Sequence, residues 1–130
     1  MFFNNTDTKT AQIINAATAK QSKAKSYLRN KEYTKATKLF EEVLSTKLEY
    51  VHVKPFISIV DIAELCNDLG KAYQALELIE NAGKYYHMSW SIYRDEFGDD
   101  HPITRNARQQ CIMIGVNQNA SRSYMSAAAA

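Results

Sequence analysis

Apolar side chains recur at intervals of three and four residues along most of this chain, which is the spacing of one buried helix face. The pattern predicts five helices, which run over about residues 10–29, 32–50, 58–75, 79–97 and 102–117. Residues that end helices lie between them. Pro55 cannot continue the second helix, and Gly98 followed by Pro102 ends the fourth helix and opens the fifth. The fold class expected is therefore all-α.

The apolar face is strongest in the second predicted helix and weakest toward the two chain ends. The second helix presents Tyr33, Ala36, Leu39, Phe40, Val43, Leu44 and Leu48. We expect Asn30 to end the first helix in the left-handed conformation and Ser58 to cap the third. The polar residues 1–9 are interpreted as a flexible lead-in, 10–117 as the helical repeat domain and 118–130 as a polar, alanine-rich tail.

One part of the chain repeats another at a constant offset of 46 residues, as between Tyr27 and Tyr73. Small residues recur where two helices must cross closely, and aromatic residues recur where they fill the angle between those helices. The matching pairs are Ala24 and Gly70, Tyr27 and Tyr73, Ala36 and Ala82, Phe40 and Tyr86, and Val43 and Ser89. The repeat predicts two similar helical hairpins placed side by side.

Composition narrows the classes of protein that remain. Four Gly and two Pro among 130 residues are too few for an all-β fold, and no glycine cluster of the P-loop or Rossmann kind occurs. No stretch approaches 18 consecutive apolar residues, so we expect no membrane span. The first residues do not resemble a secretion signal, and the cytoplasm is therefore the expected location.

The formal net charge of +2 hides an uneven distribution, because basic residues are concentrated in the first half of the chain. We expect these residues to form a solvated helix face, with contact to an acidic protein, a microtubule-like surface or RNA as the alternative. The residues concerned are Lys20, Lys23, Lys25, Arg29, Lys31, Lys35 and Lys38.

Residue patterns typical of catalysis or metal binding do not stand out. Cys66 and Cys111 lie far apart without a CxxC pair, and the histidines lack the sequence partners of a catalytic triad. The acidic residues between 95 and 100 lack the ligand spacing of an EF-hand loop. His101 directly precedes Pro102, and we expect it to cap or brace the connector there. The sequence therefore predicts no enzyme, no cofactor and no metal.

Three segments carry a resemblance to a known family: Leu69-Gly70-x2-Tyr73, then Ala82-x3-Tyr86, then Phe97-Gly98-Asp99-Asp100-His101-Pro102. The first two resemble the tetratricopeptide repeat, and the third resembles the connector of its kinesin-light-chain-type subclass. The resemblance implies a short α-solenoid of antiparallel helix pairs, with about two repeats and one further helix. It also implies that Asn67 faces a groove, where it hydrogen-bonds the backbone of a bound peptide.

The same resemblance implies a non-catalytic protein interaction module, a scaffold or adaptor whose concave groove binds a partner peptide or helix and no small-molecule substrate. The residues it places in that groove are Gln21, Lys25, Leu28, Glu64, Asn67, Lys71, Gln74, Asn106, Gln109 and Met113. One alternative is a structural subunit that docks into a larger cytoplasmic or cytoskeletal assembly, or into a homo-oligomer, through an apolar end face. A second alternative is RNA association through the basic first unit. A cytoskeletal or ciliary location follows by analogy only.

Overall fold

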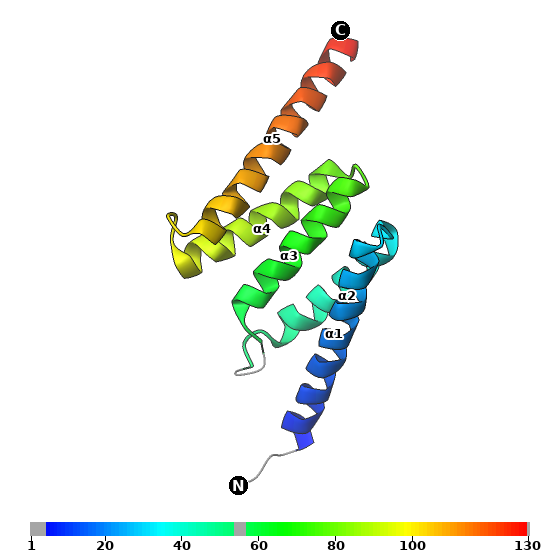
Figure 1. Cartoon of the computed structure of the whole chain (residues 1–130), viewed down its shortest axis with the longest axis vertical. Coiled ribbons are helices and arrows are strands. Elements are labelled where there is room, and N and C mark those ends of the chain that lie inside the picture. Colours follow the sequence, from blue (N-terminus) through cyan, green and yellow to red (C-terminus); the bar gives the residue numbers. More distant parts are fainter. Residues whose placement is uncertain (1–4, 54–56, 130) are drawn as a thin grey trace.

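A computed structural model describes residues 5–53 and 57–129, and the side chains of residues 8–53 and 57–115. The elements in chain order are α1 (Asn5–Arg29), α2 (Tyr33–Tyr50), α3 (Ile59–Ala75), α4 (Ile79–Phe97) and α5 (Pro102–Ala129). No strand occurs in these described ranges, and the fold is a short all-α solenoid (Figure 1). The expectation of an all-α solenoid is confirmed.

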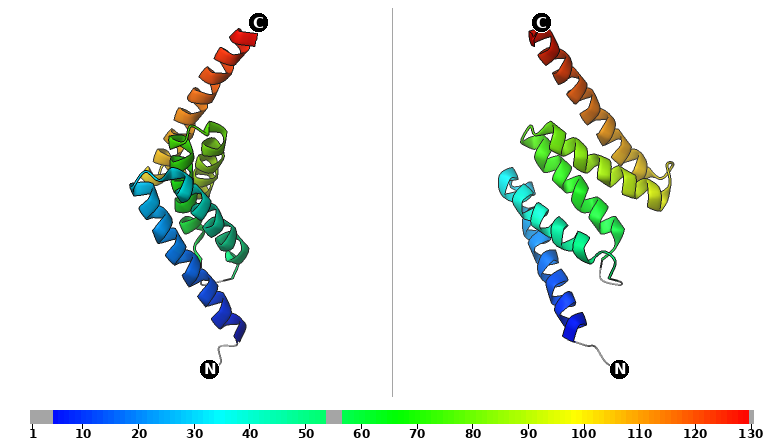
Figure 2. Two further views of the ribbon diagram at one scale, coloured as in Figure 1. Left: turned by 90° about the vertical axis from the view of Figure 1, so that its right-hand side faces the viewer. Right: turned by 180° about the vertical axis from the view of Figure 1, so that it is seen from behind.

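Each helix packs against the next one along the chain, so α1 pairs with α2 and α3 pairs with α4 as antiparallel hairpins. The helices form two layers. In Figure 1 α1, α3 and the start of α5 lie toward the viewer, whereas the view from behind in Figure 2 brings α2 and α4 forward. The first helices of successive units therefore share one face of the molecule.

The two hairpins turn in the same way, which confirms the 46-residue repeat at the level of the backbone. Lys31 and Glu77, 46 residues apart, both have a φ of 62°. The N–H of the following residue closes each turn, from Glu32 to the carbonyl of Tyr27 and from Leu78 to that of Tyr73, each at 2.9 Å. The expectation that Asn30 takes the left-handed conformation is wrong, because this closing bond places Lys31 there instead.

The small residues of the repeat lie at close helix crossings, as the sequence predicts. Ala24, Ala36 and Ala82 are fully buried. A Cβ atom added to Gly70 would lie only 2.7 Å from Cδ1 of Tyr86, so α3 and α4 can approach this closely only because the residue is glycine.

The connector between α4 and α5 is held by its own aromatic residues. Gly98 ends α4 with a φ of 85°, and its N–H donates to the carbonyl of Arg94 at 2.9 Å. The His101 ring stacks on Phe97 with centroids 4.7 Å apart, and its Nδ1 accepts a hydrogen bond of 3.1 Å from the N–H of Ile103. The prediction that His101 caps or braces this connector is confirmed.

The outer helix ends differ from their predicted positions. The first helix begins at Asn5 rather than near Thr10, and the last continues past Asn117 to Ala129. Both added stretches lack a continuous apolar stripe, and only the second is rich in alanine, which favours helix by intrinsic propensity. Residues 1–4 of the expected lead-in and Ala130 of the expected tail lie outside the described residues.

One apolar position of α2 is also different from the prediction. Leu48, expected on the buried face, is 42% exposed, whereas Lys47 is only 6% exposed. The buried residues Phe40, Val43 and Leu44 precede Lys47 at spacings of seven, four and three, so the lysine lies directly along their stripe. Residue type alone places the hydrophobic Leu48 on the buried face, whereas the helical period places Lys47 there.

Candidate binding groove

A hollow of about 260 Å³ lies between α1 and α3, and one side chain of α2 reaches into it. Most of its lining comes from α1 and α3, the first helices of the two units, which lie side by side in Figure 1. We call it the α1–α3 groove. Its lining residues are Ile14, Thr18, Gln21, Ser22, Lys25, Lys47, Ile57, Asp61 and Glu64.

An ion pair joins the two walls of the α1–α3 groove. The ammonium of Lys25 on α1 donates to Oε1 of Glu64 on α3 at 2.8 Å, with both side chains still partly open to solvent. The hydrogen bond to Glu64 raises the pKa of Lys25, and burial opposes that change. Lys25 is therefore charged at neutral pH, and two of the residues that the sequence predicted for the groove meet there.

A second lysine lies at the inner wall of the same groove. Lys47 is buried, and its ammonium donates a 2.6 Å hydrogen bond to Oε1 of Gln21. None of the ion pairs in the described part of the chain includes Lys47. Burial lowers the pKa of Lys47, and the negative charge of Asp61 partly offsets this effect. Gln21, predicted as a groove residue, is thus in the groove but uses its carbonyl oxygen internally.

The remaining predicted residues of α1 and α3 are not among those that line the α1–α3 groove. Leu28 is half-buried and packs against the hydrophobic core. Gln74 accepts a 2.8 Å hydrogen bond at Oε1 from the hydroxyl of Tyr86, so this oxygen supports the α3–α4 hairpin. Asn67 is half-buried and Lys71 is exposed. Asn67 and Lys71 form no hydrogen bond or ion pair among the described residues, although the charge of Lys71 acts on the carboxylate of Asp68.

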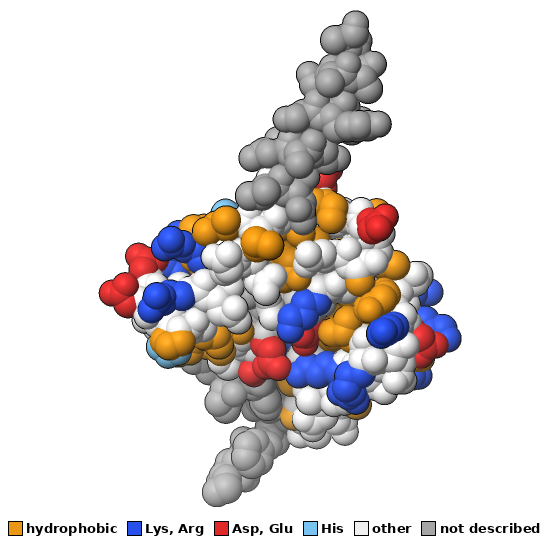
Figure 3. All heavy atoms as spheres, turned by 45° about the horizontal axis from the view of Figure 1, so that its top comes forward, with side chains coloured by type: hydrophobic (Ala, Val, Ile, Leu, Met, Phe, Trp, Pro, Cys, Tyr) orange, Lys and Arg blue, Asp and Glu red, His pale blue; other side chains and the backbone are white. Residues whose placement is uncertain are grey.

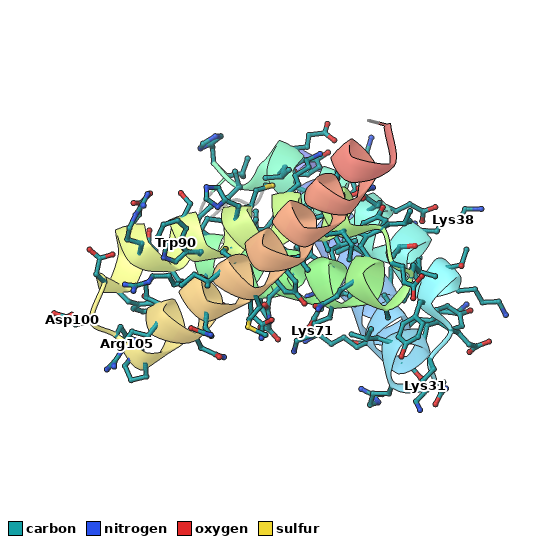
Figure 4. The ribbon with its side chains drawn as sticks, turned by 90° about the horizontal axis from the view of Figure 1, so that it is seen from above. Lys31, Lys38, Lys71, Trp90, Asp100 and Arg105 are labelled. Carbon is teal, nitrogen blue, oxygen red and sulfur yellow. The ribbon has the colours of Figure 1, made fainter. Side chains whose placement is uncertain are left out.

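The predicted residues of α5 lie apart from the α1–α3 groove. Asn106, Gln109 and Met113 are exposed, and Gln109 lines a second hollow of about 450 Å³ with the residues Asp99, Asp100, Arg105 and Arg108. Figure 4 shows Lys71 and Arg105 on one side of the ribbon and Trp90 on the other. The predicted set therefore divides into two polar surfaces, one at α1 and α3 and one at α5.

A carboxylate of α2 fixes the units to each other behind the groove. Oε1 of Glu41 accepts hydrogen bonds from the hydroxyls of Tyr73 at 2.8 Å and Tyr85 at 2.6 Å. The two tyrosine rings are stacked, with centroids 5.7 Å apart. Burial and the bond to Glu41 both raise the pKa of Tyr85. Because Glu41 belongs to the first unit and both tyrosines to the second, this cluster sets how α1 faces α3.

Sequence reasoning missed six residues of the groove, and the two charged ones among them are Lys47 and Asp61. For Lys47 a signal was present, because it continues the apolar stripe of α2 by the helical period. Asp61 lies in the first turn of α3, where a negative charge interacts favourably with the helix dipole, and this position explains the residue without a groove. Neither pattern indicates that the two side chains line the same hollow, since that depends on how α2 and α3 meet.

The basic residues of the first unit do not form one uninterrupted cationic surface. Lys20 lies 3.9 Å from a carboxylate oxygen of Glu42, and Lys35 lies 3.2 Å from one of Glu32. Lys23 and Lys35 both lie over the ring of Tyr27. Figure 3 accordingly shows basic and acidic side chains interspersed on the visible face. This mixed surface gives no support to the RNA alternative.

The two hairpins repeat each other at an offset of 46 residues, and α3 crosses α4 closely at Gly70. Both features are typical of one type of helical repeat. Residues 62–103 match the family model of the tetratricopeptide repeat. The matched segment covers nearly all of α3, the whole of α4 and the first residues of α5. No curated protein matches the chain. Tetratricopeptide repeats generally mediate protein–protein interactions and scaffolding, so the match supports a protein partner.

The described ranges of the chain contain neither an apolar helix of membrane-spanning length nor a cluster of metal-binding side chains. No group of three or more His, Cys, Asp or Glu side chains is placed there to hold a metal ion. Cys66 is buried, and this burial raises the pKa of its thiol to about 12, so the thiolate nucleophile is scarce at neutral pH.

Proposed function

We propose that this chain is a non-catalytic adaptor or scaffold module whose α1–α3 groove binds an extended segment of a partner protein. The observation that carries the proposal is the groove itself, a polar hollow between the first helices of two tetratricopeptide-like units. By the resemblance of its Phe97–Pro102 connector, we assign the module to the kinesin-light-chain-type subclass and to the cytoplasm, with cytoskeletal or ciliary association by analogy.

The chemistry of the groove suits the backbone of a peptide. A peptide in extended conformation presents both N–H donors and C=O acceptors, which the groove must satisfy to bind it. Within the groove, the hydroxyl of Ser22 can donate and accept, the amide NH2 of Gln21 can donate, and Asp61 can accept. The cluster around Glu41 holds the two units in place, so the groove exists before the partner arrives and little ordering entropy is lost.

Blocking the groove with a bulky side chain tests this function. Ser22 is exposed on α1 and lines the groove, so Ser22→Trp should fill it. Ser45 is exposed on α2 and lines no part of the groove, so Ser45→Trp is the matched control. A phage library of random linear dodecapeptides is selected on the full chain, and the affinities of the recovered peptides are measured for both variants.

Peptides that bind in the groove should lose about tenfold or more in affinity for Ser22→Trp and retain it for Ser45→Trp. Circular dichroism of both variants confirms that the helices are intact. If the selection recovers no peptide, or if every peptide binds both variants equally, the groove is not the binding site and the proposed function is wrong.

The structural-subunit alternative has one specific observation in its favour. Ile112 and Met113 on α5 are 45% and 54% exposed, which is unusual for two adjacent large apolar residues. A face of this kind would be covered if α5 docked on another subunit or on a second copy of the chain. Light scattering across a dilution series tests this alternative. A monomer at every concentration argues against self-association, and an oligomer that Met113→Lys dissociates supports it.

A further inference from the structure

Lys47 is the most unusual group in the α1–α3 groove. Its ammonium carries three N–H donors, of which one is used by Gln21 at 2.6 Å. The two others have no acceptor among the protein groups that the structure describes. Since the side chain is only 6% exposed, bulk water solvates this charge poorly. A buried cation that lacks an anionic partner is costly, and a carboxylate that reached it would gain a short, charge-assisted hydrogen bond.

The neighbouring groups complete a site for such a carboxylate. Because Oε1 of Gln21 accepts from Lys47, the amide NH2 of Gln21 is left as a donor to anything that enters the groove. The hydroxyl of Ser22 lines the same hollow. On the opposite wall the charge of Glu64 is paired with Lys25, whereas Asp61 is exposed and its negative charge acts on Lys47 without a hydrogen bond or ion pair between them. The lining charges therefore sum to zero, so the attraction for an anion is local to Lys47 and the donors beside it.

We propose that Lys47 receives the carboxylate of a single Asp or Glu side chain from the partner segment, with Gln21 and Ser22 donating to the same group. This inference rests on the proposed function, because it names what the groove recognises. The lysine comes from α2, behind the two helices that line the face of the solenoid, so the acidic side chain must point down into the groove.

The dimensions of the groove favour a side chain over a chain terminus. Its lining on α1 extends from Ile14 to Lys25, about 16 Å along the helix axis at 1.5 Å per residue. An extended peptide of about five residues spans that length at 3.3 Å per residue. Gln21 lies between the two ends of this lining. When a segment lies along the groove, its middle residues therefore lie opposite Lys47, and the side chain of one of them enters the hollow.

Substitutions that remove the charge of Lys47, and others that remove the charge of an acidic residue in the peptide, together test whether the two groups pair. Peptides recovered from the dodecapeptide library that bind the wild type and not Ser22→Trp are synthesised with each acidic residue changed to its amide. Each is measured against the wild type, Lys47→Met and Lys47→Gln. Lys38→Met is the matched control, because Lys38 is exposed on the same helix and forms no ion pair among the described residues.

One acid-to-amide change should weaken binding to the wild type and to Lys38→Met by about tenfold or more. The same change should have less than about a twofold effect on Lys47→Met, because the charge that it would pair with is gone. If Lys47→Met is not helical by circular dichroism, Lys47→Gln replaces it, since glutamine can keep a hydrogen bond to Gln21.

Three results would overturn the inference in different ways. Groove-binding peptides without an important acidic residue, or with equal amide effects on wild type and variant, would refute the role of Lys47 and leave the proposed function standing. Loss of binding on amidation of the peptide C-terminus alone would assign the carboxylate to the terminus and refute the side-chain proposal. The absence of any peptide sensitive to Ser22→Trp would refute the proposed function and this inference with it.

Discussion

The substitution Gly70→Ala should destabilise the chain, because the added methyl group would overlap the ring of Tyr86. A Cβ atom there would lie 2.7, 2.8 and 3.0 Å from Cδ1, Cε1 and Cγ of Tyr86. The ring cannot easily retreat, because it is 2% exposed and its hydroxyl is held by Gln74 at 2.8 Å. Overpacking of this kind costs about 1–3 kcal/mol in a closely packed core.

A second effect of Gly70→Ala acts in the opposite direction. Alanine is more favourable than glycine inside a helix by about 1 kcal/mol. The net loss in the free energy of unfolding should therefore be about 1 kcal/mol, and it can range from about 0 to 2 kcal/mol. Gly115→Ala in α5 isolates the helix effect, because a Cβ atom at Gly115 meets nothing within 4 Å. That variant should be more stable than the wild type by about 1 kcal/mol.

Urea unfolding followed by circular dichroism at 222 nm measures both variants under one condition. The two free energies should differ by about 1–3 kcal/mol, and this difference is the cost of the contact with Tyr86. In a Tyr86→Leu background the contact is removed, so Gly70→Ala should become neutral or stabilising. Equal stabilisation by both alanine substitutions in the wild-type background would refute the close crossing of α3 and α4.

Three further predictions concern the turns, the tyrosine cluster and the buried thiol. Lys31→Gly and Glu77→Gly should each stabilise the chain by about 0.5–1 kcal/mol, because glycine adopts the φ of 62° without strain, and unchanged urea midpoints would contradict this. Glu41→Gln should destabilise the chain by about 1–2 kcal/mol and lower the pKa of Tyr85, because the carboxylate that accepts from the Tyr85 hydroxyl is gone. An alkaline absorbance titration of the tyrosines measures this pKa, and a titration identical to that of the wild type would refute the role of the Tyr85–Glu41 hydrogen bond. The folded state raises the pKa of Cys66 from 9.0 to about 12, so this thiol contributes stability that is fully present below pH 9 and lost as the pH rises toward 12. Cys66→Ala should flatten the decline of stability across that interval, and a slope identical to the wild type would count against burial of the thiol.

The local features of the two hairpins could be predicted because each depends on residues close together in the sequence. Helical spacing identified all five helices, and Ser58 caps α3 as expected, accepting a 3.2 Å hydrogen bond from the N–H of Val60. The offset between Tyr27 and Tyr73 identified the repeat, which the paired turns at Lys31 and Glu77 confirm. The outer helix ends were misplaced because propensity, without a buried stripe, extends a helix gradually.

The candidate groove was predictable only in part. A family resemblance placed Gln21, Lys25 and Glu64 on one face, and the structure brings all three into the same hollow. The resemblance assigned no internal contacts to these residues, although Lys25 pairs with Glu64 and Gln21 accepts from Lys47. Whether a polar side chain is free for a partner depends on its neighbours from other helices, and their distances are not encoded in any local spacing.

The sequence by itself determined the helices, their turns and the small residues that let them cross, since helical period, capping and steric size act over a few residues. The helical period places Lys47 on the apolar stripe of α2, but only the tertiary structure decided that this stripe is covered at Lys47 while Leu48 is exposed. The physical reason is that α1 and α3 close over one side of α2, and the position around the helix, rather than the polarity of the side chain, sets which residue they cover. The charge buried in the groove follows from that closure.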